Sequence, residues 1–259
     1  MAQLAGQEHG GEGAAAALGE RLAQATSLEA RLGEIARAID GRIAFSSSLG
    51  LEDQAILHAA STAAPGLDIF TLDTGRLFPE TLETLQASEL RYALRIRVVA
   101  PDTRDVEALV QRDGVLGFRL SVEARKACCE ARKVRPLRRA LDGAAAWVSG
   151  LRRAQAAGRG SVPLAAWDAE HGLVKLNPLA DWTLEQLEAY VAAHDVPVNP
   201  LHARGFPSIG CQPCTRAILQ GEDIRAGRWW WELRDSKECG LHNSARRPMP
   251  PAREAEARA

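Results

Sequence analysis

Short apolar runs alternate with amphipathic segments along roughly the first 150 residues. The runs at 43–45, 67–72, 95–99 and 144–149 have the length of buried strands, and segments with apolar residues at helical spacing lie before and between them. Strands separated by helices indicate a parallel sheet that is covered on both faces. The pattern therefore predicts an α/β fold built on a doubly wound parallel sheet.

The pattern weakens after residue 153. Residues 162–167 and 173–176 are predicted to pair as a hairpin, and Thr183 with Gln186 has the spacing of a capping box before a further helix. We expect an extension over 1–25 that is disordered or helical, with a disordered start through about residue 13. An α/β domain over 26–220, a mobile segment over 221–243 and a disordered tail over 244–259 complete the predicted organisation.

Three polar loops follow predicted strands, at 46–50, 73–76 and 150–153. In parallel sheets ligands bind beyond the carboxyl ends of the strands, where these loops meet. The serine-rich loop at 46–50 precedes an acidic helix start, so its N–H groups and the helix dipole suit a phosphate or sulfate. It lacks the Gly-Lys-Ser/Thr ending of a Walker loop, which disfavours a kinase-like site. A plain helix cap is the alternative interpretation.

Composition adds mainly exclusions. The chain has 259 residues, a formal net charge of -1, and 46% hydrophobic and 25% charged residues, which is ordinary for a globular protein. This balance gives no reason to expect a nucleic-acid or membrane partner. Neither a secretory signal nor a bilayer-spanning run is recognisable. We therefore expect a cytoplasmic chain with reduced thiols, whose cysteines act as ligands or catalysts.

Four of the five cysteines form two pairs, Cys128 with Cys129 and Cys211 with Cys214. A CxxC pair is a strong metal signal when a second pair exists. Adjacent cysteines do not easily converge on one tetrahedral ion, because the rigid peptide aims their Cβ atoms apart, but they can reach two corners of an iron–sulfur cube. We interpret the four as cluster ligands. Structural zinc is the competing interpretation, and Cys129 alone can be a buried apolar thiol.

The fifth cysteine, Cys239, is flanked by Lys237 and followed by His242. A nearby cation enriches the thiolate, so we interpret Cys239 as a nucleophile; an incidental surface cysteine is the alternative. Thiolate attack on an anionic centre requires cations that neutralise it. Lys133, Arg225 and Arg228 are the candidates, although each arginine taken alone is compatible with a solvated surface. The run of three tryptophans at 229–231 is predicted to pack, and one ring could help to shield the site.

Six motifs occur in order: SSSLGLED, LDTGRLFPET, KACCEARK, WVSGLRR, GCQPCTR and KECGLH. Together they closely resemble assimilatory adenylyl-sulfate reductases, within the phosphoadenylyl-sulfate reductase family of the adenine nucleotide alpha-hydrolase-like (PP-loop) fold. The resemblance covers about residues 30–243. It implies one [4Fe-4S] cluster per chain and adenosine 5′-phosphosulfate (APS) as substrate, and its cluster ligands correspond to Cys128, Cys129, Cys211 and Cys214.

The resemblance also implies a mechanism. Cys239 would attack the sulfate sulfur, expel AMP and become an S-sulfonate, from which thioredoxin or glutaredoxin would release sulfite for sulfate assimilation and cysteine biosynthesis. The domain over 26–220 would bind the nucleotide, and 221–243 would carry the catalytic cysteine. Lys133, Arg225, Arg228 and His242 would face the phosphosulfate, with Lys133 linking the cluster's charge to the substrate. The nucleotide would be held by Ser46, Ser47, Ser48, Gly50, Leu72, Asp73, Thr74, Gly75 and Arg152.

Alternatives stay open within and beyond this family. One is a reductase for the 3′-phosphorylated substrate (PAPS), or for both substrates. An ATP-cleaving thiolation enzyme of related fold is disfavoured, since an SGGxDS-type loop is absent. A zinc-binding module would use the same four cysteines but would leave Lys133, Cys239 and the nucleotide loops unexplained. Relatives form dimers or tetramers, so the resemblance implies a homo-oligomer.

Overall fold

The computed structural model describes residues 2–155 and 159–232, and only the backbone of residues 2–10. Within these residues one sheet has the strand order β3-β2-β1-β4-β6-β5, in which every neighbouring pair is parallel except β5 with β6. The first three strands of the chain therefore lie on one side of β4 and the last two on the other. The strands are β1 (Ile43–Ser46), β2 (Asp68–Leu72), β3 (Arg97–Val99), β4 (Ala146–Val148), β5 (Ala165–Asp168) and β6 (Leu173–Leu176).

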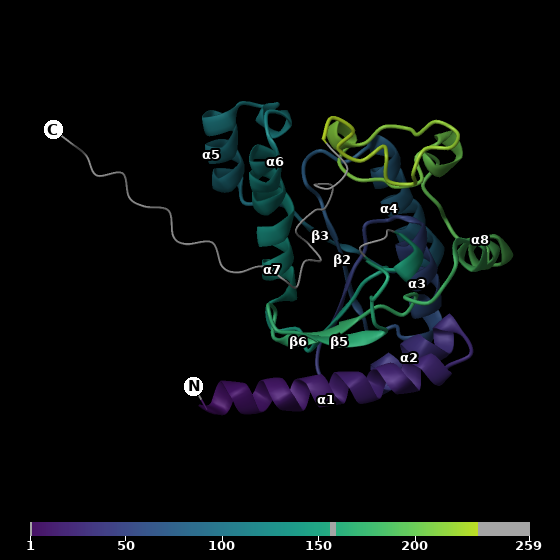
Figure 1. Ribbon diagram of the computed structural model, residues 1–259. Helices are drawn as coiled ribbons and strands as arrows, with labels where there is room; N and C mark the ends of the chain where they lie inside the picture. The colour runs from purple at the N-terminus through teal and green to yellow at the C-terminus, as the bar shows by residue number, and fades with distance from the viewer. Residues whose placement is uncertain (1, 156–158, 233–259) are drawn as a thin grey trace.

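Helices cover both faces of this sheet (Figure 1). One apolar core joins α2, α3 and α8 to β1 and β4, and partly buried side chains of α4 pack against it. The second core joins α7 to the opposite face, through Leu137 and Leu141 against Phe70 and Trp147. The helices are α1 (Ala2–Gln24), α2 (Leu28–Ala38), α3 (Leu51–Ala63), α4 (Pro79–Tyr92), α5 (Thr103–Asp113), α6 (Val122–Cys129), α7 (Arg135–Leu141) and α8 (Leu184–Ala193).

The predicted α/β class is confirmed, and each of the four predicted strand segments overlaps an observed strand. The hairpin is also present, with Ala165 opposite Leu176. It differs from the prediction in one respect, because β6 pairs in parallel with β4 and so adds the hairpin to the main sheet. The sheet is therefore mixed, with β5 as its antiparallel edge.

The expected disordered start is wrong, because α1 runs from Ala2 to Gln24. This helix lies beside the β5–β6 edge of the sheet (Figure 1), and Leu18 and Leu22 are buried in the first core. Glycine- and glutamate-containing sequence looks irregular when it is judged alone. Contact with the sheet provides the packing that stabilises such a helix.

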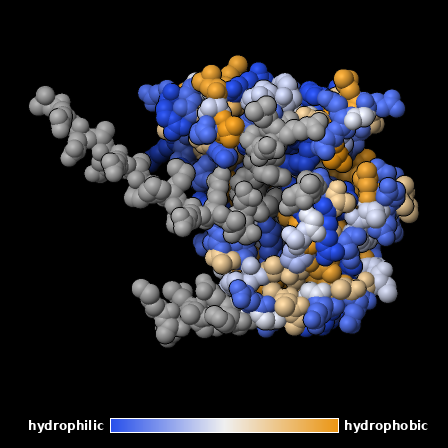
Figure 2. Space-filling view, viewed as in Figure 1, coloured by the Kyte–Doolittle hydropathy of each residue, from blue (hydrophilic) through white to orange (hydrophobic). Residues whose placement is uncertain are grey.

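The chain after α8 crosses the carboxyl end of the sheet in turns rather than long elements. The structure describes the predicted catalytic segment only as far as Glu232. Cys239, His242 and the predicted tail lie outside the described residues. Polar side chains dominate the face seen in Figure 2, and the exposed Val115, Leu116 and Leu120 belong to the connection between α5 and α6. No helix among residues 2–155 and 159–232 has the length and apolar character for crossing a bilayer.

Candidate active site

A cavity of about 250 Å³ lies beyond the carboxyl ends of β1, β2 and β4. Its position follows from the strand order, because the connections leave β1 in opposite directions and open a crevice there. The loops after β1, β2 and β4 line it, together with the segments around Lys133, Ser208 and Arg228. The residues predicted from sequence that line this cavity are Ser46, Ser47, Ser48, Gly50, Leu72, Thr74, Lys133, Arg225 and Arg228.

The serine loop is held by its own hydrogen bonds and by its neighbours. Ser47 N–H donates to the Phe70 carbonyl at 2.8 Å, and Ser47 Oγ accepts from Leu49 N–H at 3.1 Å. Leu49 has φ 60°, in the left-handed region that few residues other than glycine adopt. A conformation of this kind persists only where the surroundings impose it, and it is typical of ligand-binding loops.

Asp53 joins this loop to the loop after β4. Its Oδ2 accepts hydrogen bonds from Ser48 N–H and Ser48 Oγ, both at 2.6 Å. Burial raises the pKa of Asp53 to about 6, against the opposing effect of the Ser48 hydrogen bonds. On the other side Gly150 approaches so closely that a Cβ there would overlap the Asp53 carboxylate. In the sequence alone, this residue is recognisable only as part of an acidic helix start.

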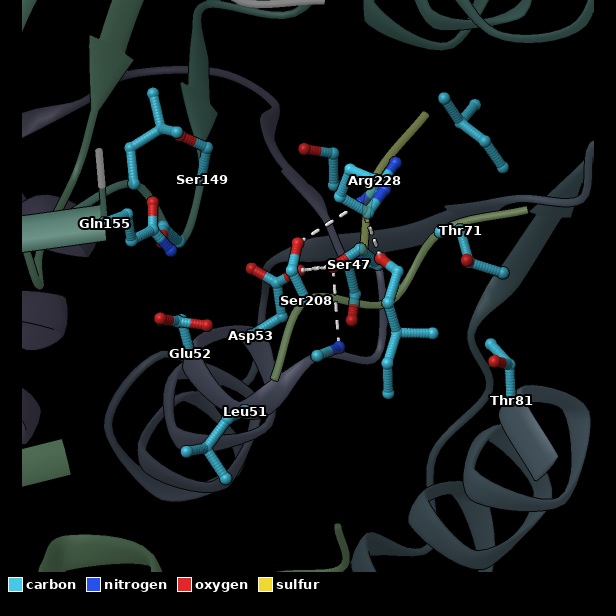
Figure 3. Close-up of a pocket in the computed structure, with 18 of the residues that line it drawn as sticks. Ser47, Leu51, Glu52, Asp53, Thr71, Thr81, Ser149, Gln155, Ser208 and Arg228 are labelled. Carbon is cyan, nitrogen blue, oxygen red and sulfur yellow. Dashed lines mark hydrogen bonds between the residues drawn. The ribbon is translucent and has the colours of Figure 1, made fainter. Parts of the chain in front are cut away.

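Arg228 brings a buried guanidinium to the opposite wall of the cavity. Its Nη1 donates to the Ile209 carbonyl at 3.1 Å and to Ser208 Oγ at 3.4 Å. Figure 3 shows Arg228 and Ser208 beside Ser47. Gly210 makes this approach possible, because a Cβ at that position would lie 2.6 Å from Arg228 Cζ. Guanidinium groups bind phosphate and sulfate oxygens well, so the wall suits an anion.

Three of the predicted substrate residues do not line the cavity, namely Asp73, Gly75 and Arg152. Asp73 accepts from Gly75 N–H at 2.8 Å and so fixes the turn after β2. Arg152 is buried, pairs with Glu52 at 2.9 Å and donates to the Trp182 carbonyl at 3.2 Å. These residues shape the loops around the cavity in this structure.

The cavity also contains side chains that the sequence analysis did not select. Ser208 and Gly210 lie just before the CxxC motif in the sequence, and this proximity could have marked them as candidates. His202 had no spacing that argued for a role, and Ser149 and Gln155 carry no local pattern that marks them. The lining residues missed include Asp53, Thr71, Trp147, Ser149, Gln155, Arg159, His202, Ser208 and Gly210.

A second, smaller cavity gathers both cysteine pairs. Thr74 Oγ1 lies 3.3 Å from Cys211 Sγ, and Gln212 N–H donates to the Arg76 carbonyl at 2.8 Å, so the loop after β2 positions the CxxC turn. None of the four cysteines is in a disulfide. The residues around this cavity are Cys128, Cys129, Cys211, Cys214, Arg76, Arg125, Arg132, Lys133, Arg228, Phe118 and Trp229.

The donor set is compatible with an iron–sulfur cluster. Within the described part of the chain no group of three or more Cys, His, Asp or Glu side chains is arranged to hold one metal ion. All four cysteines line one small cavity. Burial raises the pKa of Cys214 to about 12, and the charges of Lys133 and Arg228 oppose this rise. A positively charged metal group would favour the thiolate form there, and four thiolates are the usual set for [4Fe-4S].

The two cavities share a wall. Lys133, Arg228 and Trp229 line both of them. Lys133 lies in a π-helical turn, Glu130–Val134, that directly follows the Cys128–Cys129 pair. Such turns inside helices frequently mark functional sites. Any charge bound in the cysteine pocket would therefore lie next to Lys133 and Arg228, which also line the larger cavity.

Comparison with known proteins agrees with this geometry. Residues 42–217 match the model of the phosphoadenosine phosphosulfate reductase domain. The chain is 51% identical to adenosine 5′-phosphosulfate reductase of Agrobacterium fabrum, over 86% of each chain. It is 49% identical to the enzyme of the same name from Allochromatium vinosum, over 85% of this chain and 86% of the relative.

Among solved structures, phosphoadenylyl-sulfate reductase from Candida auris in a phosphate complex aligns with a TM-score of 0.66 and 24% identity, over 77% of this chain and 94% of that one. At this identity the likeness supports the fold alone. The match of the family model to most of the chain, and relatives at about half identity over most of their length, show that the chain belongs to the phosphoadenosine phosphosulfate reductase domain family.

Proposed function

We propose that this enzyme reduces APS to sulfite and AMP. The observation that carries the proposal is the shared wall of Lys133, Arg228 and Trp229, which sets an anion cavity directly against a pocket of four cysteines. The names of the curated relatives agree with this substrate. A nucleotide phosphosulfate has anionic oxygens for the serine loop and the guanidinium groups, and a sulfur atom open to a nucleophile.

The proposed first step is attack by the Cys239 thiolate on the sulfate sulfur. A sulfur–sulfur bond forms, the bond from that sulfur to the bridging oxygen breaks, and AMP leaves with the electron pair. Lys133, Arg225 and Arg228 would offset the charge of the incoming thiolate and of the leaving phosphate, because attack on an anion is repulsive without cations. His242 is proposed as a further group facing the phosphosulfate.

The second step consumes two electrons from a dithiol protein. A thiolate of thioredoxin or glutaredoxin attacks Cys239 Sγ, and sulfite leaves with the electron pair of the broken sulfur–sulfur bond. The second thiol of the reductant then resolves the mixed disulfide, which restores the Cys239 thiol. We place this reaction in sulfate assimilation and cysteine biosynthesis, in the cytoplasm.

Cys128, Cys129, Cys211 and Cys214 are proposed to hold one [4Fe-4S] cluster per chain. When bound, the cluster supplies a local charge that helps to orient the cations of the shared wall, rather than electrons for the reduction. A zinc-binding module is the weaker proposal, because it gives no role to the larger cavity or to the buried Arg228.

Sulfite release by anaerobically purified protein tests the proposal. APS and PAPS are supplied side by side, each with thioredoxin and with glutaredoxin. We expect strong preference for APS. Preference for PAPS would retain the reductase chemistry and contradict the proposed substrate. Absence of sulfite release with both substrates, in protein of verified iron content, would contradict the proposed function.

The nucleophile is tested by Cys239→Ser. Because a serine hydroxyl is a far weaker nucleophile than a thiolate, we expect sulfite release to be abolished while APS still binds. Calorimetric titration with APS measures binding in the same preparation. A variant that still turns over would remove Cys239 from the mechanism.

A further inference from the structure

A buried ion pair lies behind the shared wall, and the proposed reaction gives it no role. Arg125 Nε donates to Glu232 Oε1 at 2.6 Å, and the two side chains are 1% and 3% exposed. Arg125 Cζ also lies 4.4 Å from the centroid of the Trp229 ring. Neither Arg125 nor Glu232 lines the larger cavity, so any effect on substrate must pass through another residue.

The pair connects the cysteine-bearing helix to the end of the described chain. Arg125 is on α6, three and four residues before Cys128 and Cys129, so these three residues share one face of the helix. The Arg125 guanidinium also lines the cysteine pocket and is held against the Glu232 carboxylate. Because the two charges offset each other, the pair contributes a fixed geometry rather than net charge.

Trp229 is the group on which this geometry acts. It is buried, and its backbone N–H donates to the Cys214 carbonyl at 3.1 Å. Its φ of 42° is unusual for a residue with a large side chain, so its surroundings must hold it in place. The neighbouring Arg228 has its Cζ 4.8 Å from the centroid of the same ring. A guanidinium at this distance is attracted by the ring, so the placement of the ring affects the placement of Arg228.

We infer that Arg125 and Glu232 are positioning residues that act through Trp229 on Arg228, and so set the affinity of the larger cavity for its anionic ligand. The contacts form a contiguous chain from the ion pair to the ring and from the ring to a guanidinium in the cavity. The inference deepens the proposed function and rests on it in taking the phosphosulfate as that ligand.

A double-mutant cycle tests the inference in the full, iron-containing chain. Glu232→Ala and Arg228→Ala are made singly and together in a Cys239→Ser background, which keeps APS from being consumed. Titration calorimetry measures the dissociation constant for APS and, as a probe independent of the reaction, for inorganic phosphate. We expect Glu232→Ala to weaken APS binding about tenfold when Arg228 is present and less than about twofold when it is absent.

Glu232→Gln guards against misfolding, because the amide oxygen can still accept from Arg125 Nε while the charge is lost. It should weaken APS binding less than Glu232→Ala does. Exchange of the two residues, Arg125→Glu with Glu232→Arg, should recover part of the lost affinity. Iron content is measured on every sample and should stay at the parent level.

Two results would overturn the inference. Equal weakening by Glu232→Ala with and without Arg228 would show a general structural role, and a loss of iron in proportion to the loss of affinity would place the effect in the cysteine pocket. Failure of the proposed function has a different signature. In that case the parent does not bind APS, while phosphate binding still shows the dependence of the Glu232 effect on Arg228.

Discussion

Single side chains in the cavity have properties that their sequence positions do not indicate. Asp53 is a carboxyl group in a place that suits anions, and it is tolerated there because Ser48 donates two hydrogen bonds to it. Its raised pKa shows that burial still outweighs those bonds. The residue therefore fixes the serine loop at a cost in stability whenever it is ionised.

This cost predicts a pH dependence. The pKa of Asp53 rises from 3.8 to about 6 on folding, so between these values the folded state binds more protons than the unfolded state. Stability from this group is therefore lost as pH rises from about 4 to 6, by on the order of 3 kcal/mol. In Asp53→Asn that loss should be absent. Urea unfolding at several pH values compares the two proteins, and parallel profiles would contradict the assignment.

Gly210 offers a test of the placement of Arg228. In Gly210→Ala the new methyl group would lie 2.6 Å from Arg228 Cζ, and the flexible arginine would move away. We expect KM for APS to rise about tenfold with a change in stability of less than about 1 kcal/mol, because a strong guanidinium–anion contact is lost. Gly66→Ala is the control, since a Cβ there meets nothing within 4 Å. Equal KM values for the two variants would contradict the prediction.

Whole elements show how the sheet edge is protected. β5 is an edge strand, and exposed edges of this kind invite pairing with other chains. Helix α1 packs against it, with Gly11 facing Trp167 and Gly19 facing Ala165. The small residues on this side of the helix let it lie close to the strand, which explains why a glycine-containing segment is useful here.

Two alanine substitutions in α1 should have opposite effects. In Gly11→Ala the Cβ would lie 2.6 Å from Trp167 Cε3, so we expect a loss of about 1–3 kcal/mol in the free energy of unfolding. In Gly13→Ala the Cβ meets nothing within 4 Å, and the higher helix propensity of alanine should add up to about 1 kcal/mol. Urea unfolding of the full chain measures both. Stabilisation by both substitutions would show that α1 does not press against β5.

Across the whole molecule, the cysteine pocket joins distant parts of the chain. Cys128 and Cys129 end α6, whereas Cys211 and Cys214 belong to a turn that follows α8. A metal group bound by all four would therefore crosslink two segments that no regular element connects. Ligands that bind only the folded state stabilise it, so loading of the pocket should raise thermal stability.

Cys211→Ala should remove this crosslink. We expect iron content and the visible absorption of the cluster to be lost, and the midpoint of thermal unfolding to fall by several degrees. Iron assay, absorption spectra and calorimetry measure these changes under anaerobic conditions. Cys239→Ser is the control and should keep its iron. Unchanged iron in Cys211→Ala would remove that residue from the ligand set.

Local sequence was sufficient for the strand segments and for part of the cavity lining. Short apolar runs bounded by polar loops can be buried in few ways, so the strand segments and the carboxyl-end location of the site followed from periodicity alone. The capping box at Thr183 is present as predicted, because it depends on residues three apart. The serine loop, Lys133, Arg225 and Arg228 were found from residue type and motif, and they line one cavity.

Contacts between distant segments decided the rest. Asp53, Ser208 and Gly210 matter because the strand order brings their loops together, and nothing in their own neighbourhoods reveals that. Arg152 pairs with Glu52 instead of lining the cavity for the same reason. The helix α1 packs against β5, a strand far away in the sequence. Periodicity and motifs report local geometry, whereas burial, pairing and the approach of two loops exist only once the chain has folded.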